Sequence, residues 1–337
     1  MRRIWQAFIV ACVIYVSICD AAQTSGKKGK RKLNLPDTNT DMSARRTTRA
    51  GTWYADNAPI LNQQLQTWLD QAPVLHSPAR AIIAPHAGYR ACGACSAFAY
   101  RQIDPTNVKR LFILAPSHRG RVSGCGLSSC STYKNPLYDL TIDKQVYEHL
   151  NATGSFETFS RSIDEKEHSI EMQLPYIAKV MEKYEGSFTI VPVLVGRLNL
   201  TRQQEYGEIF APYLANPENL FVISSDFWHW GKKFNYTYHD PAYGEIYQFI
   251  EHLDRMAMDL IENLDPVGFA NEPELRGKTI CGRNAIGILL YAVNTLRRNT
   301  ANELKPTLRF LNYAQNRRCT SMNDTCVSYA CGALTMQ

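Results

Sequence analysis

The stretch AIIAPHAGYR, residues 81–90, ends an apolar run with Pro85 and then His86. The same arrangement returns in LFILAPSHRG, residues 111–120, where His118 follows an Ala-Pro pair and a serine. Short continuous apolar runs are typical of strands that are covered on both faces by helices. Proline lacks a backbone N–H and has a fixed φ, so each Ala-Pro pair predicts the end of a strand just before a histidine.

The rest of the chain alternates between apolar strand candidates and segments with apolar residues at helical spacing. This alternation predicts a single α/β domain with a mixed, mostly parallel central sheet flanked by helices. A helix at 59–72 is expected to begin with Asn57 as its cap and Pro59 in its first turn. The strand candidates are 81–84, 111–114, 188–196, 221–224, 308–314 and 327–336, and the other helix candidates are 244–266 and 285–298.

Basic charge is concentrated in the first 50 residues of the 337-residue chain. Ten of the 37 Lys and Arg residues lie there, together with only three acidic residues, so the remainder is near neutral despite a formal net charge of +6. A near-neutral body gives no electrostatic basis for a nucleic-acid partner.

The N-terminal region divides into two segments of different composition. Residues 1–22 have the layout of a secretory signal peptide, with two arginines, an apolar stretch and then small residues. The apolar stretch is too short to form a stable membrane span. Residues 23–48 are polar, basic and aperiodic, which predicts a disordered linker. The folded domain is therefore expected over residues 49–337.

Three strand candidates are followed by side chains that can bind a metal or move a proton. His86 and His118 follow the first two, and Asp226 and His229 follow the strand at 221–224. Ligands of open α/β sheets bind outside the carboxyl ends of the strands, so these side chains are expected to meet at one edge of the sheet.

Cys281 lies just before a helix candidate. A helix N-terminus favours the thiolate, which is the form of cysteine that binds metal. With His86 and His118 it makes a ligand set for iron, copper or zinc that leaves a coordination position open. Asp226 and His229 would orient the ligands or act as a proton-transfer pair. Each residue alone more often has a structural role, but their convergence from separate strands favours a metal site.

A further polar cluster lies in EKEHSIEMQLPY, residues 165–176. His168 and Glu171 are three residues apart, so they would share one face if this segment were helical. His168 is therefore a further candidate for proton transfer or for support of the ligands. The alternative is that the acidic residues only complement the dipole of a helix N-terminus.

The sequence CGAC, from Cys92 to Cys95, suggests a different chemistry. A C-x-x-C pair at the start of a helix that follows a strand is typical of dithiol redox sites. The alternative is that these small residues let the helix pack closely on the sheet. The sequence has no Walker loop, G-x-S-x-G elbow, H-E-x-x-H motif or Rossmann glycine fingerprint. Metal chemistry or binding therefore remains the favoured interpretation.

Several of these motifs, taken in order, resemble the Memo family, whose name stands for mediator of ErbB-driven cell motility. The resemblance runs from about Gly51 to the C-terminus. It rests on AIIAPHAGY, LFILAPSH, DEKEHSIEMQLPY, PVLVG, SSDFWHWG, GEIYQFIEHLDRMAMDLIE, TICGR and FLNYAQ, with GTWY and GALT near the two ends.

The resemblance implies a fold similar to that of the class III extradiol dioxygenases, which hold non-haem Fe(II) with two histidines and a carboxylate. In Memo-like proteins the corresponding pocket has two histidines and a cysteine, which fall here on His86, His118 and Cys281, with Asp226 and His229 beside them. It further implies iron or copper binding, phosphotyrosine-containing receptor peptides as partners, a cytoplasmic location, and a role in receptor tyrosine kinase and cytoskeletal signalling. Dioxygenase activity is not an established property of the family.

The chain departs from the family pattern at a few positions. Trp228 stands where the family motif has cysteine, which is expected to reshape the pocket. Cys130, Cys326 and Cys331 are additional cysteines, which would suit disulfides in a secreted chain. Three hypotheses follow: a metal-dependent redox protein, a non-catalytic phosphotyrosine-peptide binder that uses a vestigial dioxygenase pocket, and a dithiol redox protein that uses Cys92 and Cys95.

Overall fold

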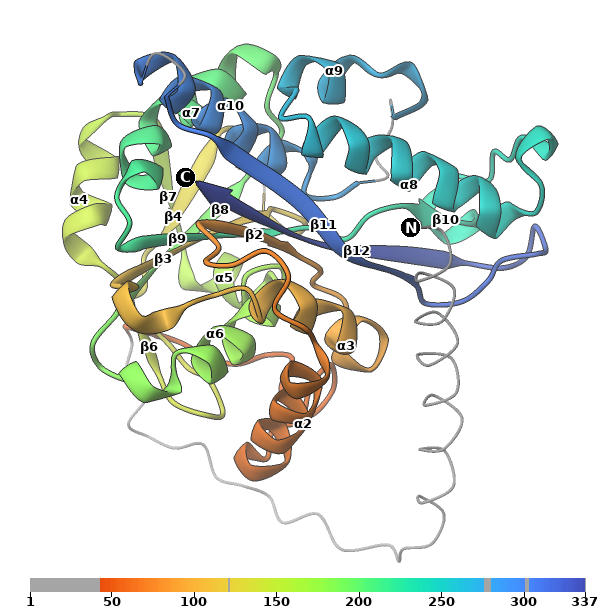
Figure 1. Ribbon diagram of the computed structural model, residues 1–337. Coiled ribbons are helices and arrows are strands. Elements are labelled where there is room, and N and C mark those ends of the chain that lie inside the picture. The colour runs from red at the N-terminus through yellow and green to blue at the C-terminus, as the bar shows by residue number, and fades with distance from the viewer. Residues whose placement is uncertain (1–42, 121, 276–279, 301–302, 337) are drawn as a thin grey trace, which may run out of the picture. The chain divides into compact units, whose positions relative to one another are not determined.

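The computed structural model describes residues 43–120, 122–275, 280–300 and 303–336. The expected signal peptide and most of the expected linker lie outside these residues. Within them, nine strands form one mixed sheet in the order β10-β12-β2-β9-β3-β8-β4-β7, with β11 paired to β12, and three short strands form a second sheet in the order β1-β5-β6 (Figure 1). The strands are β1 Ala44–Arg45, β2 Ala81–Ala84, β3 Arg110–Pro116, β4 Cys125–Ser128, β5 Thr132–Tyr133, β6 Leu140–Thr141, β7 Phe156–Phe159, β8 Thr189–Val195, β9 Asn219–Ser224, β10 His229–Trp230, β11 Pro306–Gln315 and β12 Cys326–Met336.

The four central strands of the large sheet, β2, β9, β3 and β8, are parallel. The pairings of β12 with β2, of β10 and β11 with β12, and of β4 with β8 are antiparallel. Registers such as Ala84 with Ser224 and Leu114 with Ile223 bring the carboxyl ends of β2, β9 and β3 to the same edge. The predicted mixed α/β sheet is confirmed, and its parallel part is the part that positions the site.

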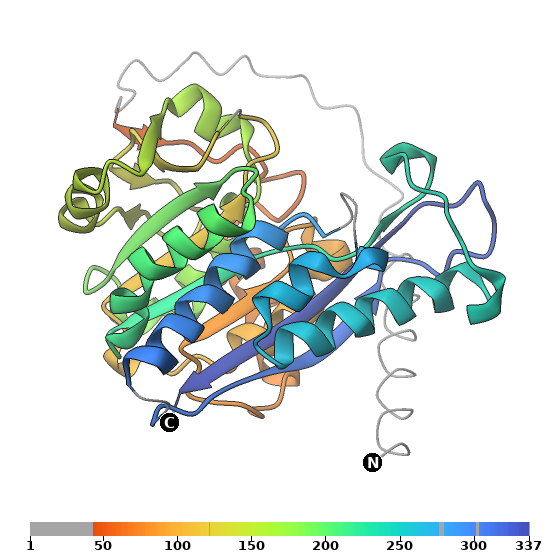
Figure 2. The ribbon, with the colours of Figure 1, turned by 90° about the horizontal axis from the view of Figure 1, so that it is seen from above.

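Helices cover both faces of the large sheet. Figure 1 shows α2, α3 and α6 on one side and α7, α8, α9 and α10 on the other, and Figure 2 looks onto the second group. Both faces of β2, β3 and β9 are buried, which explains why these strands are continuous apolar runs rather than alternating ones. The helices are α2 Ala58–Gln71, α3 Tyr89–Tyr100, α4 Lys144–Ala152, α5 Arg161–Lys166, α6 Leu174–Val180, α7 Leu200–Ala215, α8 Ile246–Glu262, α9 Pro266–Asn271 and α10 Arg283–Asn299.

Local sequence signals explain where several helices begin and end. The side chain of Asn57 accepts a hydrogen bond from the backbone N–H of Ile60, and Pro59 lies in the first turn of α2, as predicted. The single helix expected over 244–266 is instead two helices. Leu264 has a positive φ of 56° after α8 has ended, and Pro266 then starts α9. The residue before a proline avoids the helical region, which prevents one continuous helix here.

The folded unit begins earlier than the expected boundary at residue 49. β1 pairs with β5, and the side chain of Arg45 is 1% exposed. Its guanidinium group pairs with Asp164 at 2.9 Å and with Glu171 at 2.8 Å. Residues 43–48 are thus part of the fold and not of a linker. No apolar run marks this boundary, because the buried anchor is an arginine.

No helix in the described ranges is both long enough and apolar enough to cross a membrane.

Candidate metal centre

His86 lies two residues after the end of β2 and is 2% exposed. Its Nδ1 lies 2.8 Å from the hydroxyl of Ser224, at the end of β9. That hydroxyl donates its one hydrogen to the carbonyl of Ser169 and accepts a hydrogen bond from Gln173. Nδ1 of His86 must therefore be the donor to Ser224, because the hydroxyl has no second hydrogen to give. In the neutral ring this leaves a lone pair on Nε2, which faces the sulfur of Cys281 at 3.1 Å.

His118 follows β3 and is held by Glu167, which comes just after α5. The backbone N–H of His118 donates to Oε2 of Glu167 at 2.5 Å, and its Nδ1 lies 3.0 Å from Oε1. The same carboxylate accepts backbone N–H groups from Arg119, His168 and Ser169. Burial tends to raise the pKa of Glu167, but the hydrogen bond and charge of His118 hold that pKa well below its usual range. An ionised Glu167 can only accept, so it fixes the proton of His118 on Nδ1 and leaves Nε2 available.

Cys281 lies two residues before α10, as the sequence predicted. Its sulfur accepts the backbone N–H of Asp226 at 3.2 Å. The expectation of a thiolate is not met in the protein without a metal, because burial and the nearby Asp226 raise the pKa of Cys281 well above its usual range. The effect of burial on the pKa of Cys281 is larger than the opposite effect of the helix N-terminus. A bound cation would reverse this direction, since coordination deprotonates a thiol.

The three predicted ligands converge. His86, His118 and Cys281 each offer one ligand atom, and these atoms lie within 4.8 Å of one another. Both histidines have Nδ1 committed to a hydrogen-bond acceptor, which is the usual arrangement of histidines that bind metal. A second group of three potential ligands, His118, Glu167 and His168, shares one histidine with the first. The donor set of two imidazoles and one sulfur therefore suits a metal ion.

Asp226 and His229 lie beside this cluster. Oδ1 of Asp226 accepts the backbone N–H of His86 at 2.8 Å, while Oδ2 is 4.0 Å from Nε2 of His86. Burial raises the pKa of Asp226, and the nearby His229 opposes that shift. Nδ1 of His229 lies 2.9 Å from the carbonyl of Phe227, which orients its ring. Asp226 is thus a support for the His86 backbone as well as an acid–base candidate.

His168 reaches the same edge by a different route from the one expected. It lies between α5 and a 3-10 helix at Glu171–Gln173, and not on a helical face shared with Glu171. The Glu171 carboxylate points to Arg45, Thr48, Arg49 and Tyr54 instead. The ring of His168 stacks on His118 with centroids 4.7 Å apart.

Electrostatics favour neutral imidazoles at His86 and His168. Burial lowers the pKa of His86 well below its usual range, and the neighbouring His118 and His168 act in the same direction. Burial also lowers the pKa of His168 to about 4, with Glu167 opposing the shift and nearby cationic groups adding to it. Neutral imidazole is the form that binds metal, so His86 is prepared for coordination at neutral pH.

The two cysteines of CGAC do not form a redox pair in this structure. Cys92 donates to the carbonyl of Ala87, and the sulfur of Cys95 lies 3.3 Å from that of Cys331. Both thiols are buried, and burial raises the pKa of Cys92 well above its usual range. A dithiol redox site needs an accessible thiol of lowered pKa, so these contacts disfavour the third hypothesis. Trp228 was expected to reshape the pocket. Its ring instead packs in the hydrophobic core, edge-to-face on Tyr236.

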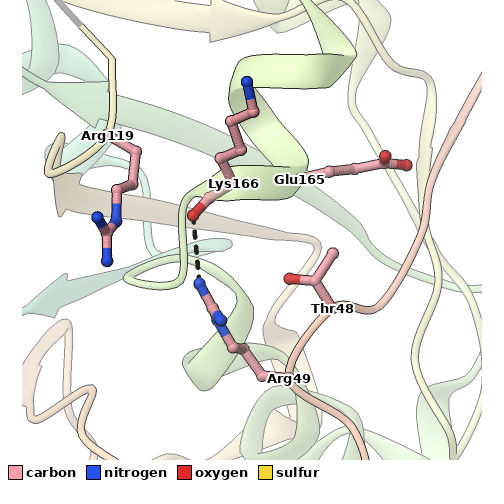
Figure 3. Close-up of a pocket in the computed structure, with 5 residues that line it drawn as sticks. All are labelled: Thr48, Arg49, Arg119, Glu165 and Lys166. Atoms are coloured by element: carbon pink, nitrogen blue, oxygen red, sulfur yellow. Dashed lines mark hydrogen bonds between the residues drawn. The ribbon is translucent and has the colours of Figure 1, made fainter.

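A cationic cavity of about 390 Å³ opens near the cluster, and sequence reasoning missed it. It is lined by Thr48, Arg49, Arg119, Glu165 and Lys166 (Figure 3). Glu165 is already paired with two other arginines, Arg46 and Arg161. Figure 3 shows the guanidinium groups of Arg49 and Arg119 facing one region, while the amine of Lys166 points away from them.

The cavity is coupled to the metal cluster through aromatic contacts. The guanidinium of Arg49 lies 5.1 Å from the ring centroid of Trp53. That ring meets His168 edge-on, with centroids 4.9 Å apart. The cavity combines residues from 48–49, 119 and 165–166, whose proximity only the fold establishes. The sequence likewise did not predict that Ser224 and Glu167 hold the two imidazoles, although each lies in a polar stretch near a predicted site residue.

Fold and site together define a class: an α/β protein with a two-histidine, one-cysteine cluster at the carboxyl ends of parallel strands. The family model described as Memo-like protein matches residues 45–333, and the chain belongs to this family.

Known relatives extend over nearly the same region. Protein MEMO1 of Mus musculus is 54% identical over 292 residues, which is 87% of this chain and 97% of the mouse protein. Human protein MEMO1 is 53% identical over the same length. The protein memo-1 homolog of Caenorhabditis elegans is 46% identical over 291 residues, which cover 86% of this chain and 82% of the nematode protein. A solved Escherichia coli structure, of uncharacterized protein JW3007, matches with a TM-score of 0.40 at 11% identity over 74% of this chain and 98% of its own, a likeness too distant to inform function.

Proposed function

We propose that this chain is a metal-binding redox protein whose centre holds iron or copper on His86, His118 and Cys281. The observation that supports it most is the commitment of both Nδ1 atoms, one to Ser224 and one to Glu167. Ordinary structural histidines do not need two prepared Nε2 lone pairs within 4.8 Å of a thiol. Zinc fits the same ligand set but would supply no redox chemistry.

The chain's own groups have separable tasks in this proposal. Ser224 and Glu167 orient the imidazoles and keep their protons on Nδ1. Asp226 and His229 hold or move a proton beside the ligands, and His168 stacks on His118. An iron or copper ion, when bound, would supply one-electron chemistry and open positions for a further ligand.

Metal titration is the direct test. Purified, chelator-treated protein would be titrated anaerobically with Fe(II) and Cu(I) and then exposed to O₂, with spectra recorded throughout. We expect one equivalent to bind and the affinity to fall sharply in His118→Ala and Cys281→Ser. His149→Ala, on an exposed helical position, is the matched control. Wild-type protein that binds no more tightly than His118→Ala would refute the proposal.

The cationic cavity favours a second candidate function, the recognition of phosphotyrosine-containing receptor peptides. Within the described residues, neither Arg119 nor Lys166 forms an ion pair with a carboxylate, so their charges are available to an anion. Arginine binds phosphate groups well because its planar fork donates two hydrogen bonds. Together with the family resemblance, this supports a role in receptor tyrosine kinase and cytoskeletal signalling during cell motility.

Calorimetry separates this candidate from the first. A tyrosine-phosphorylated peptide and its unphosphorylated counterpart would be titrated into metal-free protein. We expect only the phosphorylated form to bind, and Arg119→Ala to weaken binding more than Lys166→Ala, which removes the same charge from a side chain that points away. Equal affinities for the two peptides would contradict the candidate and leave the metal proposal intact.

Two expectations about the location of the protein conflict. The resemblance implies the cytoplasm, whereas residues 1–22 predict secretion. Mass spectrometry of the mature protein decides between them, because cleavage near residue 22 is expected only for a secreted chain.

A further inference from the structure

Strand β12 carries two cysteines, and each lies near a cysteine from another segment. The sulfur of Cys331 lies 3.3 Å from the sulfur of Cys95, which is in α3. Both residues are buried, at 0% and 4% exposure. A disulfide bond is about 2.05 Å long, so closing this pair requires the sulfurs to approach by little more than an ångström.

The second pair lies at the start of the same strand. Cys326 is the first residue of β12, and Cys319 lies in the connection from β11. Burial raises the pKa of the Cys326 thiol, the nearby Cys319 adds to this shift, and both residues are fully buried. Cys326 also donates to the carbonyl of Arg317, so its sulfur is turned toward this connection.

We propose that Cys95–Cys331 and Cys319–Cys326 are disulfide-forming pairs that tie β12 to α3 and to its own hairpin connection. Each pair would be oxidised by thiol–disulfide exchange with a small-molecule disulfide such as oxidised glutathione. One protein thiolate attacks the glutathione disulfide and releases one glutathione thiol. The second protein thiolate then displaces the other glutathione from the mixed disulfide. The protein loses two hydrogens per pair, and one glutathione disulfide becomes two thiols.

Two of the four remaining described cysteines, Cys281 and Cys92, have sulfur contacts of their own. Cys281 faces His86 and the backbone of Asp226, so it stays available to a metal. Cys92 is hydrogen bonded to the carbonyl of Ala87. The inference therefore does not depend on the proposed metal chemistry.

The position of β12 gives the two links a structural consequence. β12 lies between β2, which leads to His86, and β10, which contains His229. Cys95 and Cys331 are 236 residues apart, and the stabilisation from a disulfide increases with the length of the loop it closes. The first link is therefore expected to contribute most of the stabilisation, and the second to fix the local hairpin.

Peptide mapping of the full chain tests the proposal. The protein would be reduced, denatured and refolded with a chelator in a reduced/oxidised glutathione buffer, and free thiols would be blocked before digestion without reductant. We expect linked peptides for 95–331 and 319–326, and a melting temperature roughly 5–10 °C above that of the fully reduced protein.

Single variants assign each link and provide controls. Cys331→Ala should lose only the 95–331 peptide, and Cys326→Ser only the 319–326 peptide. Cys125→Ala, which alters a fully buried strand cysteine outside both pairs, should retain both links. Natively folded wild type with all four thiols free would overturn the proposal. A Cys92–Cys95 link would also overturn it, and would restore the dithiol hypothesis.

Discussion

The ends of β2 and β3 carry the same sequence signal but support their histidines differently. His86 is 2% exposed and is held by neutral Ser224 within the core, whereas the His118 side chain is 29% exposed and is held by the charged Glu167. A carboxylate makes a histidine ligand more basic than a hydroxyl does. His86 and His118 therefore share one motif but differ in the group that holds Nδ1 and in their access to solvent.

The two supports also depend on different parts of the molecule. Ser224 is in β9, directly beside β2 in the sheet. Glu167 is held from outside the sheet, because Nη2 of Arg45 donates to its carbonyl at 2.8 Å. Arg45 therefore links the N-terminal segment of the fold to the His118 side of the centre.

Breaking this link should have the largest effect. Arg45→Ala leaves Asp164 and Glu171 as buried carboxylates without their cation, so we expect the free energy of unfolding to fall by about 3–5 kcal/mol. Urea denaturation followed by circular dichroism measures it. Arg46→Ala, one residue away at an exposed ion pair, should leave the denaturation curve unchanged. Similar losses in the two variants would show that Arg45 is not the anchor.

The second largest effect is expected from acid, which should lower the folding stability through protonation of His168, the residue stacked on His118. The folded pKa of His168 is about 4 and its unfolded value is about 6.5, so the unfolded state takes up the proton first. The stability linked to this group is fully present above pH 6.5 and is lost as the pH falls toward 4. This loss is about 3 kcal/mol.

Denaturation of metal-free protein across this pH range measures the effect. His168→Gln should have a shallower pH dependence than wild type, whereas the exposed control His149→Gln should follow wild type. Parallel curves for wild type and His168→Gln would contradict the assignment.

The smallest expected effect is on metal affinity, and it should distinguish the Glu167 support of His118 from the Ser224 support of His86. Glu167→Gln removes the charge behind His118, and we expect metal affinity to fall by up to about 100-fold. Ser224→Ala removes a neutral acceptor behind His86, and a loss nearer 10-fold is expected. Competition with a chromophoric chelator measures both, after circular dichroism has shown that each variant is folded. A larger loss in Ser224→Ala would reverse the ranking of the two sides.

The apolar runs predicted the central sheet well because strands buried on both faces must be apolar throughout. The short strands β4, β7 and β10 were not predicted, since they are two to four residues long and partly polar. The predicted start of the folded domain, residue 49, was several residues too late because Arg45 is a charged residue in a buried position. Its burial is compensated by carboxylates more than one hundred residues away, which no local pattern reveals.

The sequence by itself determined the strand ends, and with them the approach of His86 and His118 to one edge. It could do so because parallel strands bring their carboxyl ends together whatever the loops do. Only the tertiary structure decided which partners fix the imidazole protons, that Cys281 is a buried thiol before any metal binds, and that Cys95 meets Cys331. These outcomes depend on contacts across the whole fold, where burial and a few hydrogen bonds determine the charge of each group.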